Sequence, residues 1–207
     1  MILDLADLAE RLATRLDPLD APMVEARRGD FDLNPHIARA PRGPLTRAAV
    51  LAPIVRRPEG WTLLLTQRTD SMPTHAGQVA FPGGRVQAED ADAVAAALRE
   101  CEEETGIPRA LITPLGGLDP WETGTGYSVA PIIAYLDPAY EARPDPREVA
   151  AIFETPLAFL FDPTNHERRQ AEWKGETRTY YAMPYEGRFI WGATAGMIRA
   201  LYERLYG

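Results

Sequence analysis

The stretch FPGGRVQAEDADAVAAALRECEEETG, residues 81–106, places a glycine pair ahead of a helix whose last turn is crowded with acidic residues. The helix is expected over residues 92–105. Residues three and four positions apart share one face of a helix. Glu100, Glu103 and Glu104 should therefore form one acidic face. A separate apolar stripe should pack on the core, and its members are Val94, Ala97, Leu98 and Cys101.

The acidic face lies at the end of the helix that is least favourable for negative charge. The helix dipole is negative at the C-terminus, and like charges one turn apart repel each other. Arg99 is the single basic residue between positions 86 and 108. A run of Glu is ordinarily a solvated helix face, because Glu is a good helix former. A bound divalent cation would instead neutralise the cluster, and Mg²⁺ and Mn²⁺ prefer carboxylate oxygens as ligands.

Gly83 and Gly84 lie a few residues before this helix. Two glycines allow a sharp bend and a close approach of the backbone to a ligand, although a plain turn is the better explanation of the pair when it is taken alone. Familiar phosphate loops do not fit, because the chain has no G-x-x-x-x-G-K-[ST] and GGRVQA does not match G-x-G-x-x-G. We expect the pair to lie beside the acidic face and to contact substrate.

Composition excludes several classes of protein. The 207 residues include 22 basic and 30 acidic side chains, for a net charge of -8. That balance disfavours a nucleic-acid partner, for which a basic face is expected, and it permits an anionic substrate whose charge a metal ion compensates. No apolar run is long enough to span a membrane. Cys101 is the single cysteine, so an intrachain disulfide is excluded and a cytoplasmic protein is expected.

Apolar periodicity elsewhere predicts a mixture of strands and helices. An amphipathic helix is expected over residues 2–16, and the Pro- and Arg-rich residues 17–45 read as an extended arm, whose role is left open among covering the site, packing on a partner subunit and capping the sheet. Strands are expected within residues 48–57, 61–68, 78–81, 111–118, 127–136 and 148–161, with a second hairpin over 177–192 and a closing helix over 194–207. Because strands and helices do not alternate regularly, the fold class is α+β.

The second half of the acidic helix carries a resemblance. RECEEETGI resembles the signature of the Nudix hydrolases, Arg-Glu-apolar-x-Glu-Glu-x-Gly-apolar, and it matches at every position, through Arg99, Glu100, Cys101, Glu103, Glu104, Gly106 and Ile107. The first half departs from the family pattern. Arg85 and Ala91 stand where that pattern has Gly and Glu, while Gly84 lies one residue further from Arg99 and Asp90 takes the acidic place.

The longer spacing is similar to the branch that resembles coenzyme A pyrophosphatases. That branch also has a preceding segment, roughly L-L-T-x-R-[SA]-x3-R-x3-G-x3-F-P-G-G. The chain reads LLTQRTDSMPTHAGQVAFPGG over residues 64–84, with Thr69 in place of Ser or Ala and Pro73 in place of the second Arg. Pro has no charge or donor with which to bind a phosphate. The resemblance continues in TGTGYSVAPIIAYL and FIWGATAGMIRAL, and covers about residues 48–205.

The resemblance implies an α+β Nudix fold, in which a mixed β-sheet is sandwiched between helices, over residues 46–207, with residues 1–45 as an N-terminal helix and extended arm. It implies that Glu100 and Glu104 bind Mg²⁺ or Mn²⁺, and that Glu103 is a ligand or the base that orients water. The remaining expected site residues are Arg99, which orients the glutamates, Glu148, an additional acid before a strand, Arg68, which binds a substrate phosphate, and Gly83 and Gly84. A plain loop residue is an equally good interpretation of Glu148.

The expected activity is hydrolysis of the pyrophosphate bond of coenzyme A or its derivatives, which gives 3′,5′-ADP and 4′-phosphopantetheine. Pro73 motivates a first alternative, a Nudix hydrolase of other substrates such as ADP-ribose or NADH. A second alternative is a Nudix-fold domain that binds a ligand without turnover. The expected partner is a small nucleotide-linked molecule rather than a nucleic acid or a membrane, and a homodimer is left open.

Overall fold

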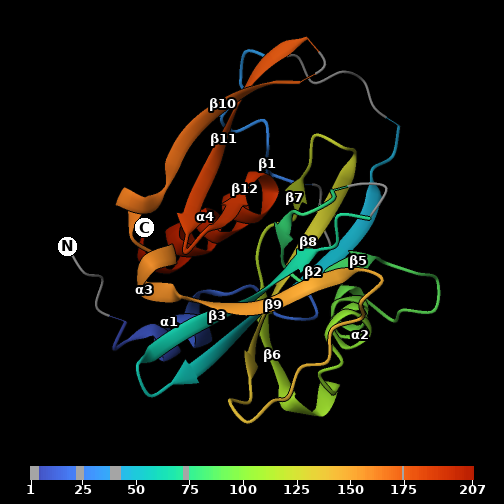
Figure 1. The fold of residues 1–207 in the computed structure, drawn as a ribbon, viewed down its shortest axis with the longest axis vertical. Helices are drawn as coiled ribbons and strands as arrows, with labels where there is room; N and C mark the ends of the chain where they lie inside the picture. Colours follow the sequence, from blue (N-terminus) through green and yellow to red (C-terminus); the bar gives the residue numbers. More distant parts are fainter. Residues whose placement is uncertain (1–4, 22–25, 38–42, 72–74, 174) are drawn as a thin grey trace.

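A computed structural model describes residues 5–21, 26–37, 43–71, 75–173 and 175–207. Within these residues the strands form a nine-stranded sheet and a separate three-stranded sheet. Figure 1 shows the larger sheet at the centre, with the hairpin of the smaller sheet extending away from it. The expected helix over residues 2–16 falls partly outside the described residues, and the helix that is described begins only at Leu8.

The larger sheet is mixed, which confirms the expected fold class. Its strands are β1 (Arg28–Gly29), β2 (Thr46–Arg57), β3 (Gly60–Arg68), β4 (Val79–Ala80), β5 (Gly83–Arg85), β6 (Ile112–Gly117), β7 (Trp121–Glu122), β8 (Tyr127–Leu136) and β9 (Val149–Pro156). The order is β1-β7-β8-β2-β3-β4, with β5 on β2, β6 on β8 and β9 on β3. β2 runs parallel to β8 and antiparallel to β3, so the predicted hairpin at residues 58–60 is confirmed.

Helices cover both faces of this sheet. α2 (Ala93–Thr105) packs through Ala97 and Cys101 on one face, against alternate side chains of β2 and β8. The other face is covered by α1 (Leu8–Arg15), α3 (Leu157–Leu160) and α4 (Gly192–Tyr206). The two cores use opposite sides of the same strands, since successive side chains of a strand alternate. The result is the expected layered arrangement of a sheet between helices, in which α2 lies across the sheet from α1 and α4 (Figure 1).

The three-stranded sheet was only partly predicted. β11 (Glu176–Tyr185) and β12 (Arg188–Trp191) form the hairpin expected around Glu186 and Gly187, both of which have positive φ. β10 (Glu167–Trp173) pairs with β11 along its whole length and has no counterpart in the sequence-based expectations. Its sequence ERRQAEW is almost wholly exposed, so it lacks the apolar alternation by which a half-buried strand is recognised.

The arm before β2 ties the two sheets together. β1 pairs in parallel with β7 at the edge of the larger sheet. Asp30 accepts hydrogen bonds from Nε1 of Trp121 and from the backbone N–H of Gly124. Asn34 exchanges side-chain hydrogen bonds with the backbone of Thr179 on β11. The described part of the arm therefore caps one sheet edge and holds the smaller sheet beside it.

Candidate active site

The acidic helix is fixed at both ends. Asp92 caps its N-terminus by accepting a hydrogen bond from the backbone of Ala95 at 2.8 Å. Gly106 ends it in the left-handed conformation, φ 67°, which glycine adopts without strain. The last carbonyls are also bonded, since the N–H of Arg143 donates to Thr105 and that of Asp145 donates to Glu104. The loop of residues 143–148 therefore holds the acidic end of α2 in place.

The glycine pair lies in a strand rather than in a plain turn. β5 pairs with β2, and a Cβ on Gly83 would come within 2.4 Å of the backbone oxygen of Ala49. A Cβ on Gly84 would lie 2.5 Å from the carboxylate carbon of Glu100. The sequence leads us to expect contact between the pair and substrate, which remains a prediction. What the structure adds is that Gly83 lets β5 pack closely on β2, while Gly84 lets it pack directly under Glu100 of the acidic helix.

Glu104 is the most buried of the acidic residues on this face, with a side chain that is 6% exposed. Its Oε2 accepts a hydrogen bond of 3.3 Å from the backbone N–H of Gly83, and its Oε1 lies 3.8 Å from Nη1 of Arg68. Burial raises the pKa of Glu104 to about 8, and these two neighbours only partly oppose that effect. A negative charge at this position is therefore poorly compensated by the protein alone.

Glu100 and Glu103 share one cation, Arg99. Nη1 of Arg99 lies 2.8 Å from Oε1 of Glu100 and 3.1 Å from Oε2 of Glu103. The Glu100 side chain is 16% exposed and burial raises its pKa, whereas the Glu103 side chain is 58% exposed. The expected ion pairing of Arg99 with the glutamates is thus present, with one carboxylate inside the site and one at its mouth.

Asp90, which the family resemblance assigns only to an acidic place in the pattern, contacts the other side of the Arg99 guanidinium. Both of its oxygens accept hydrogen bonds of 2.9 Å, from Nε and Nη2 of Arg99, and Nη2 also donates to the carbonyl of Arg85. The Arg99 guanidinium lowers the pKa of Asp90 to about 2. Such a two-point contact fixes the plane of a guanidinium, so Arg99 is held rigidly. The signal available in the sequence was the acid nine residues before Arg99.

Glu148 and Arg68 come from neighbouring strands. The carbonyl of Glu148 accepts a hydrogen bond from the N–H of Thr69, which joins the start of β9 to the end of β3. Burial is the main cause of the raised pKa values of Glu100 and Glu104, and the charge of Glu148 contributes to both. Glu148 itself is exposed. Four acids therefore gather with Arg68 around the C-terminal end of α2. We call them the acidic cluster, and they are Glu100, Glu103, Glu104 and Glu148.

Other residues of the region lie outside this group. The carboxylate of Glu102 accepts a hydrogen bond of 2.7 Å from Nε of Arg109, outside the acidic face. Cys101 is fully buried and burial raises the pKa of its thiol to about 12, as expected for a core residue. His75 is exposed and contacts Gln78. Pro73 lies outside the described residues.

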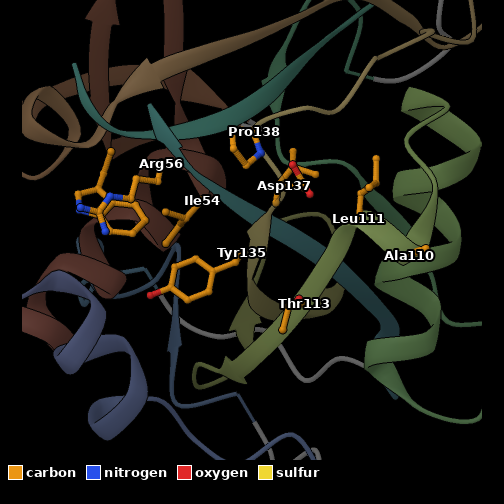
Figure 2. A pocket seen from close by; sticks show the side chains of 10 residues that line it. Ile54, Arg56, Ala110, Leu111, Thr113, Tyr135, Asp137 and Pro138 are labelled. Atoms are coloured by element: carbon orange, nitrogen blue, oxygen red, sulfur yellow. The ribbon is translucent and has the colours of Figure 1, made fainter. Parts of the chain in front are cut away.

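A separate pocket of about 350 Å³ lies at the other ends of β2 and β8 (Figure 2). Figure 2 shows Arg56, Tyr135 and Asp137 around it, and the ring of Trp61 stacks on that of Tyr135 at 5.8 Å. None of the acidic residues of α2 lines it. The pocket is therefore separate from the acidic face of α2.

The profile of the NUDIX domain matches residues 45–176. The chain belongs to the Nudix family. It is 46% identical over 155 residues to "Uncharacterized Nudix hydrolase NudL" of Escherichia coli (strain K12), a match that covers 75% of this chain and 80% of that protein. A protein of the same name from Shigella flexneri is 44% identical over 169 residues, covering 82% of this chain and 87% of that one.

Solved structures agree on the fold. The crystal structure of DR0079 from Deinococcus radiodurans matches with a TM-score of 0.50 at 17% identity, covering 83% of this chain and 91% of that chain. A likeness at that identity concerns the fold alone. As a Nudix hydrolase, the chain cleaves acid anhydride bonds of nucleotide-linked small molecules with the help of a divalent metal ion. No helix among the described residues is long and apolar enough to cross a membrane.

The acidic cluster fits a divalent cation by its chemistry, although its oxygens do not yet converge. Among the described residues, no three acidic, histidine or cysteine side chains are grouped so that they could hold a metal ion as they lie. Glu100 and Glu103 are turned onto Arg99, and Glu104 faces Gly83 and Arg68. All are carboxylates, the ligands that Mg²⁺ and Mn²⁺ prefer.

Proposed function

We propose that this Nudix hydrolase cleaves the pyrophosphate bond of coenzyme A or its derivatives with Mg²⁺ or Mn²⁺, releasing 3′,5′-ADP and 4′-phosphopantetheine. The observation that carries the proposal is the buried Glu104 beside both Gly83 and Arg68. It brings the acidic helix into contact with the segment of residues 64–84, which resembles coenzyme A pyrophosphatases. Glu104 thus joins the proposed metal-binding helix to the segment on which the proposed substrate rests.

Glu100 and Glu104 are proposed to hold the metal ion, with Glu103 as a further ligand or as the base that orients water. When bound, the ion polarises a phosphoryl oxygen and lowers the pKa of coordinated water. Glu104 suits a ligand because its carboxylate is buried and its ion pair with Arg68 is a loose one, at 3.8 Å. Glu103 suits a base because its exposed carboxylate can reach solvent at the mouth of the site. Glu148 is proposed to assist as an additional acid.

Arg99 is proposed as a positioning residue, since it contacts two of these carboxylates and is itself fixed by Asp90. Its guanidinium, fixed by Asp90, bridges Glu100 and Glu103 through Nη1 and offsets the repulsion between their charges. Arg68 is proposed to bind a phosphate of the substrate. Its Nε is buried and has no hydrogen-bond partner among the described residues. The Arg68 side chain is 20% exposed. A guanidinium can bind two phosphate oxygens at once, so a substrate phosphate is proposed to contact its exposed nitrogens.

The test is incubation of the purified protein with coenzyme A and Mg²⁺, with the products separated by chromatography. ADP-ribose and NADH are run beside it, because Pro73 replaces an arginine of the coenzyme A pattern. We expect 3′,5′-ADP and 4′-phosphopantetheine, and the highest kcat/KM for coenzyme A. Survival of coenzyme A while ADP-ribose or NADH is cut would overturn the substrate and leave the hydrolase.

A further inference from the structure

One face of the smaller sheet carries aromatic and basic side chains that the proposed chemistry does not use. Tyr181, Met183 and Ile190 pack toward α4 and the core. Because side chains alternate along a strand, Tyr180, Phe189 and Trp191 point to the opposite face. We call this opposite face the aromatic face. All three of its rings are half-buried.

The rings of the aromatic face form one cluster. Tyr180 meets Trp191 edge-on, with ring centroids 5.2 Å apart, and Phe189 lies 6.1 Å from Trp191. Two guanidinium groups border the cluster. Arg169, which is paired with Tyr180 across the strands, lies 5.0 Å above the ring of Phe189. Arg178, two residues before Tyr180 on the same face, lies 4.3 Å above the ring of Trp173.

The aromatic face is anchored twice at the end of the larger sheet that carries the acidic cluster. Thr194 lies in the first turn of α4, which directly follows Trp191. Its hydroxyl donates a hydrogen bond to the carbonyl of Val79 in β4, the strand before Gly83. A Cβ added to Gly124 would lie 3.2 Å from Nη1 of Arg178 and 3.4 Å from Cζ3 of Trp173.

The loop that contains Gly124 continues directly into Tyr127, whose hydroxyl accepts hydrogen bonds from the Arg85 guanidinium. Arg85 is the residue after the glycine pair. The aromatic face is therefore connected from two sides to β5, the strand that contains the glycine pair. One connection runs through β4 and the other through this loop.

The chemistry of the aromatic face matches a nucleotide. Aromatic rings bind bases by stacking, and guanidinium groups bind phosphates. The Arg178 guanidinium lies beside Gly124 and interacts electrostatically with the Asp30 carboxylate, while its Nε is buried and has no hydrogen-bond partner among the described residues. We propose that Tyr180, with Phe189 and Trp191, stacks the nucleobase of the substrate and that Arg178 binds a phosphate of the same nucleotide. This subsite rests on the proposed function, since it assigns the nucleotide half of the substrate to the smaller sheet.

Adenosine 5′-monophosphate and ribose 5-phosphate are the test ligands, because they differ by the base alone. Their dissociation constants are measured by calorimetry on the full chain in Mg²⁺. We expect the wild type to bind the nucleotide about tenfold tighter or more, a factor typical of one stacked base. Tyr180→Leu should abolish that difference, and Tyr180→Phe should keep it. Arg178→Ala should weaken both ligands.

Arg168→Ala is the matched control, since Arg168 lies on the same strand pair but over Tyr181, on the opposite face. It should change neither constant. Equal binding of the two ligands by the wild type, or an unchanged preference in Tyr180→Leu with an unaltered melting temperature, would overturn the proposal. Preference for the nucleotide together with no hydrolysis of any dinucleotide would support the subsite while removing the proposed activity, so the two failures are distinguishable.

Discussion

Oε1 of Glu104 lies 3.8 Å from Nη1 of Arg68, and both side chains are largely buried between β3 and α2. The two residues are far apart in the sequence. Their contact places an arginine of the segment 64–84, which resembles coenzyme A pyrophosphatases, against a carboxylate of the proposed metal site. At that separation the pair is a loose one, and the buried Arg68 Nε has no partner among the described residues. We propose that the other, partly exposed nitrogens of this guanidinium are available to a substrate phosphate, since the Arg68 side chain is 20% exposed.

Arg68→Met tests this availability. Losing a guanidinium that binds a substrate phosphate should raise KM for coenzyme A about tenfold or more, with a smaller effect on kcat. Arg56→Met is the control, because Arg56 is an exposed arginine at the far end of β2, over Trp61. Steady-state kinetics measure both. An unchanged KM in Arg68→Met would remove Arg68 from the substrate site.

The raised pKa of Glu104 predicts how stability depends on pH in metal-free protein. Burial raises this pKa from 4.5 to about 8, so the folded state binds the proton more tightly than the unfolded state does. Stability should therefore rise as the pH falls from about 8 toward 5, by an amount on the order of a few kcal/mol at most.

Melting temperatures in the presence of a chelator, between pH 5 and 9, measure this slope. Glu104→Gln removes the titrating group, so its melting temperature should be higher than that of the wild type at pH 8 and should vary less with pH. A wild-type melting temperature that rises with pH across this range, with the same slope in Glu104→Gln, would contradict the assignment.

Added Mg²⁺ should oppose the same destabilisation. A cation that binds only the folded state raises the melting temperature by mass action, by about 1.4 kcal/mol of stability for each tenfold excess over Kd. We expect a rise at millimolar Mg²⁺ in the wild type and none in Glu100→Gln. Glu102→Gln should retain the rise, because Glu102 is on the same helix but bonds Arg109 outside the cluster. Equal shifts in both variants would place the ion elsewhere.

Gly84→Ala tests the packing of β5 under the acidic helix. The added Cβ would lie 2.5 Å from the carboxylate carbon of Glu100, so this carboxylate must move. We expect kcat to fall about tenfold or more, because small displacements of catalytic groups are costly. Gly117→Ala is a strand control, since its Cβ would meet a backbone oxygen at an ordinary 3.7 Å. Retention of full activity in Gly84→Ala would show that the position of Glu100 is unimportant.

Local signals explain what could be predicted from the sequence. The helix over residues 92–105 was expected and α2 spans Ala93–Thr105, because apolar spacing, an Asp cap and Gly106 all agree. The grouping of Glu100, Glu103 and Glu104 followed from helix geometry alone. The contact of Arg99 with Glu103 could also be anticipated, since these residues are four positions apart on the helix, whereas its contact with the adjacent Glu100 depends on the side-chain conformation.

Long-range contacts could not be predicted in this way. Three contacts of the site depend on how the strands and α2 pack. They join Asp90 to Arg99, Gly84 to Glu100 and Arg68 to Glu104. β10 escaped prediction for a different reason. Its charged, exposed sequence is stabilised by pairing with β11 and not by an apolar face of its own.

The most direct measurement of the central claim is kcat/KM for coenzyme A with Mg²⁺ in Glu103→Gln and Glu102→Gln, compared with the wild type. Both variants replace a carboxylate by an amide at neighbouring positions of α2. Of the two residues, only Glu103 contacts Arg99. We expect kcat/KM to fall about 10²- to 10⁴-fold in Glu103→Gln. In Glu102→Gln it should stay near the wild-type value, and both variants should fold as the wild type does. Full activity of Glu103→Gln would contradict the account.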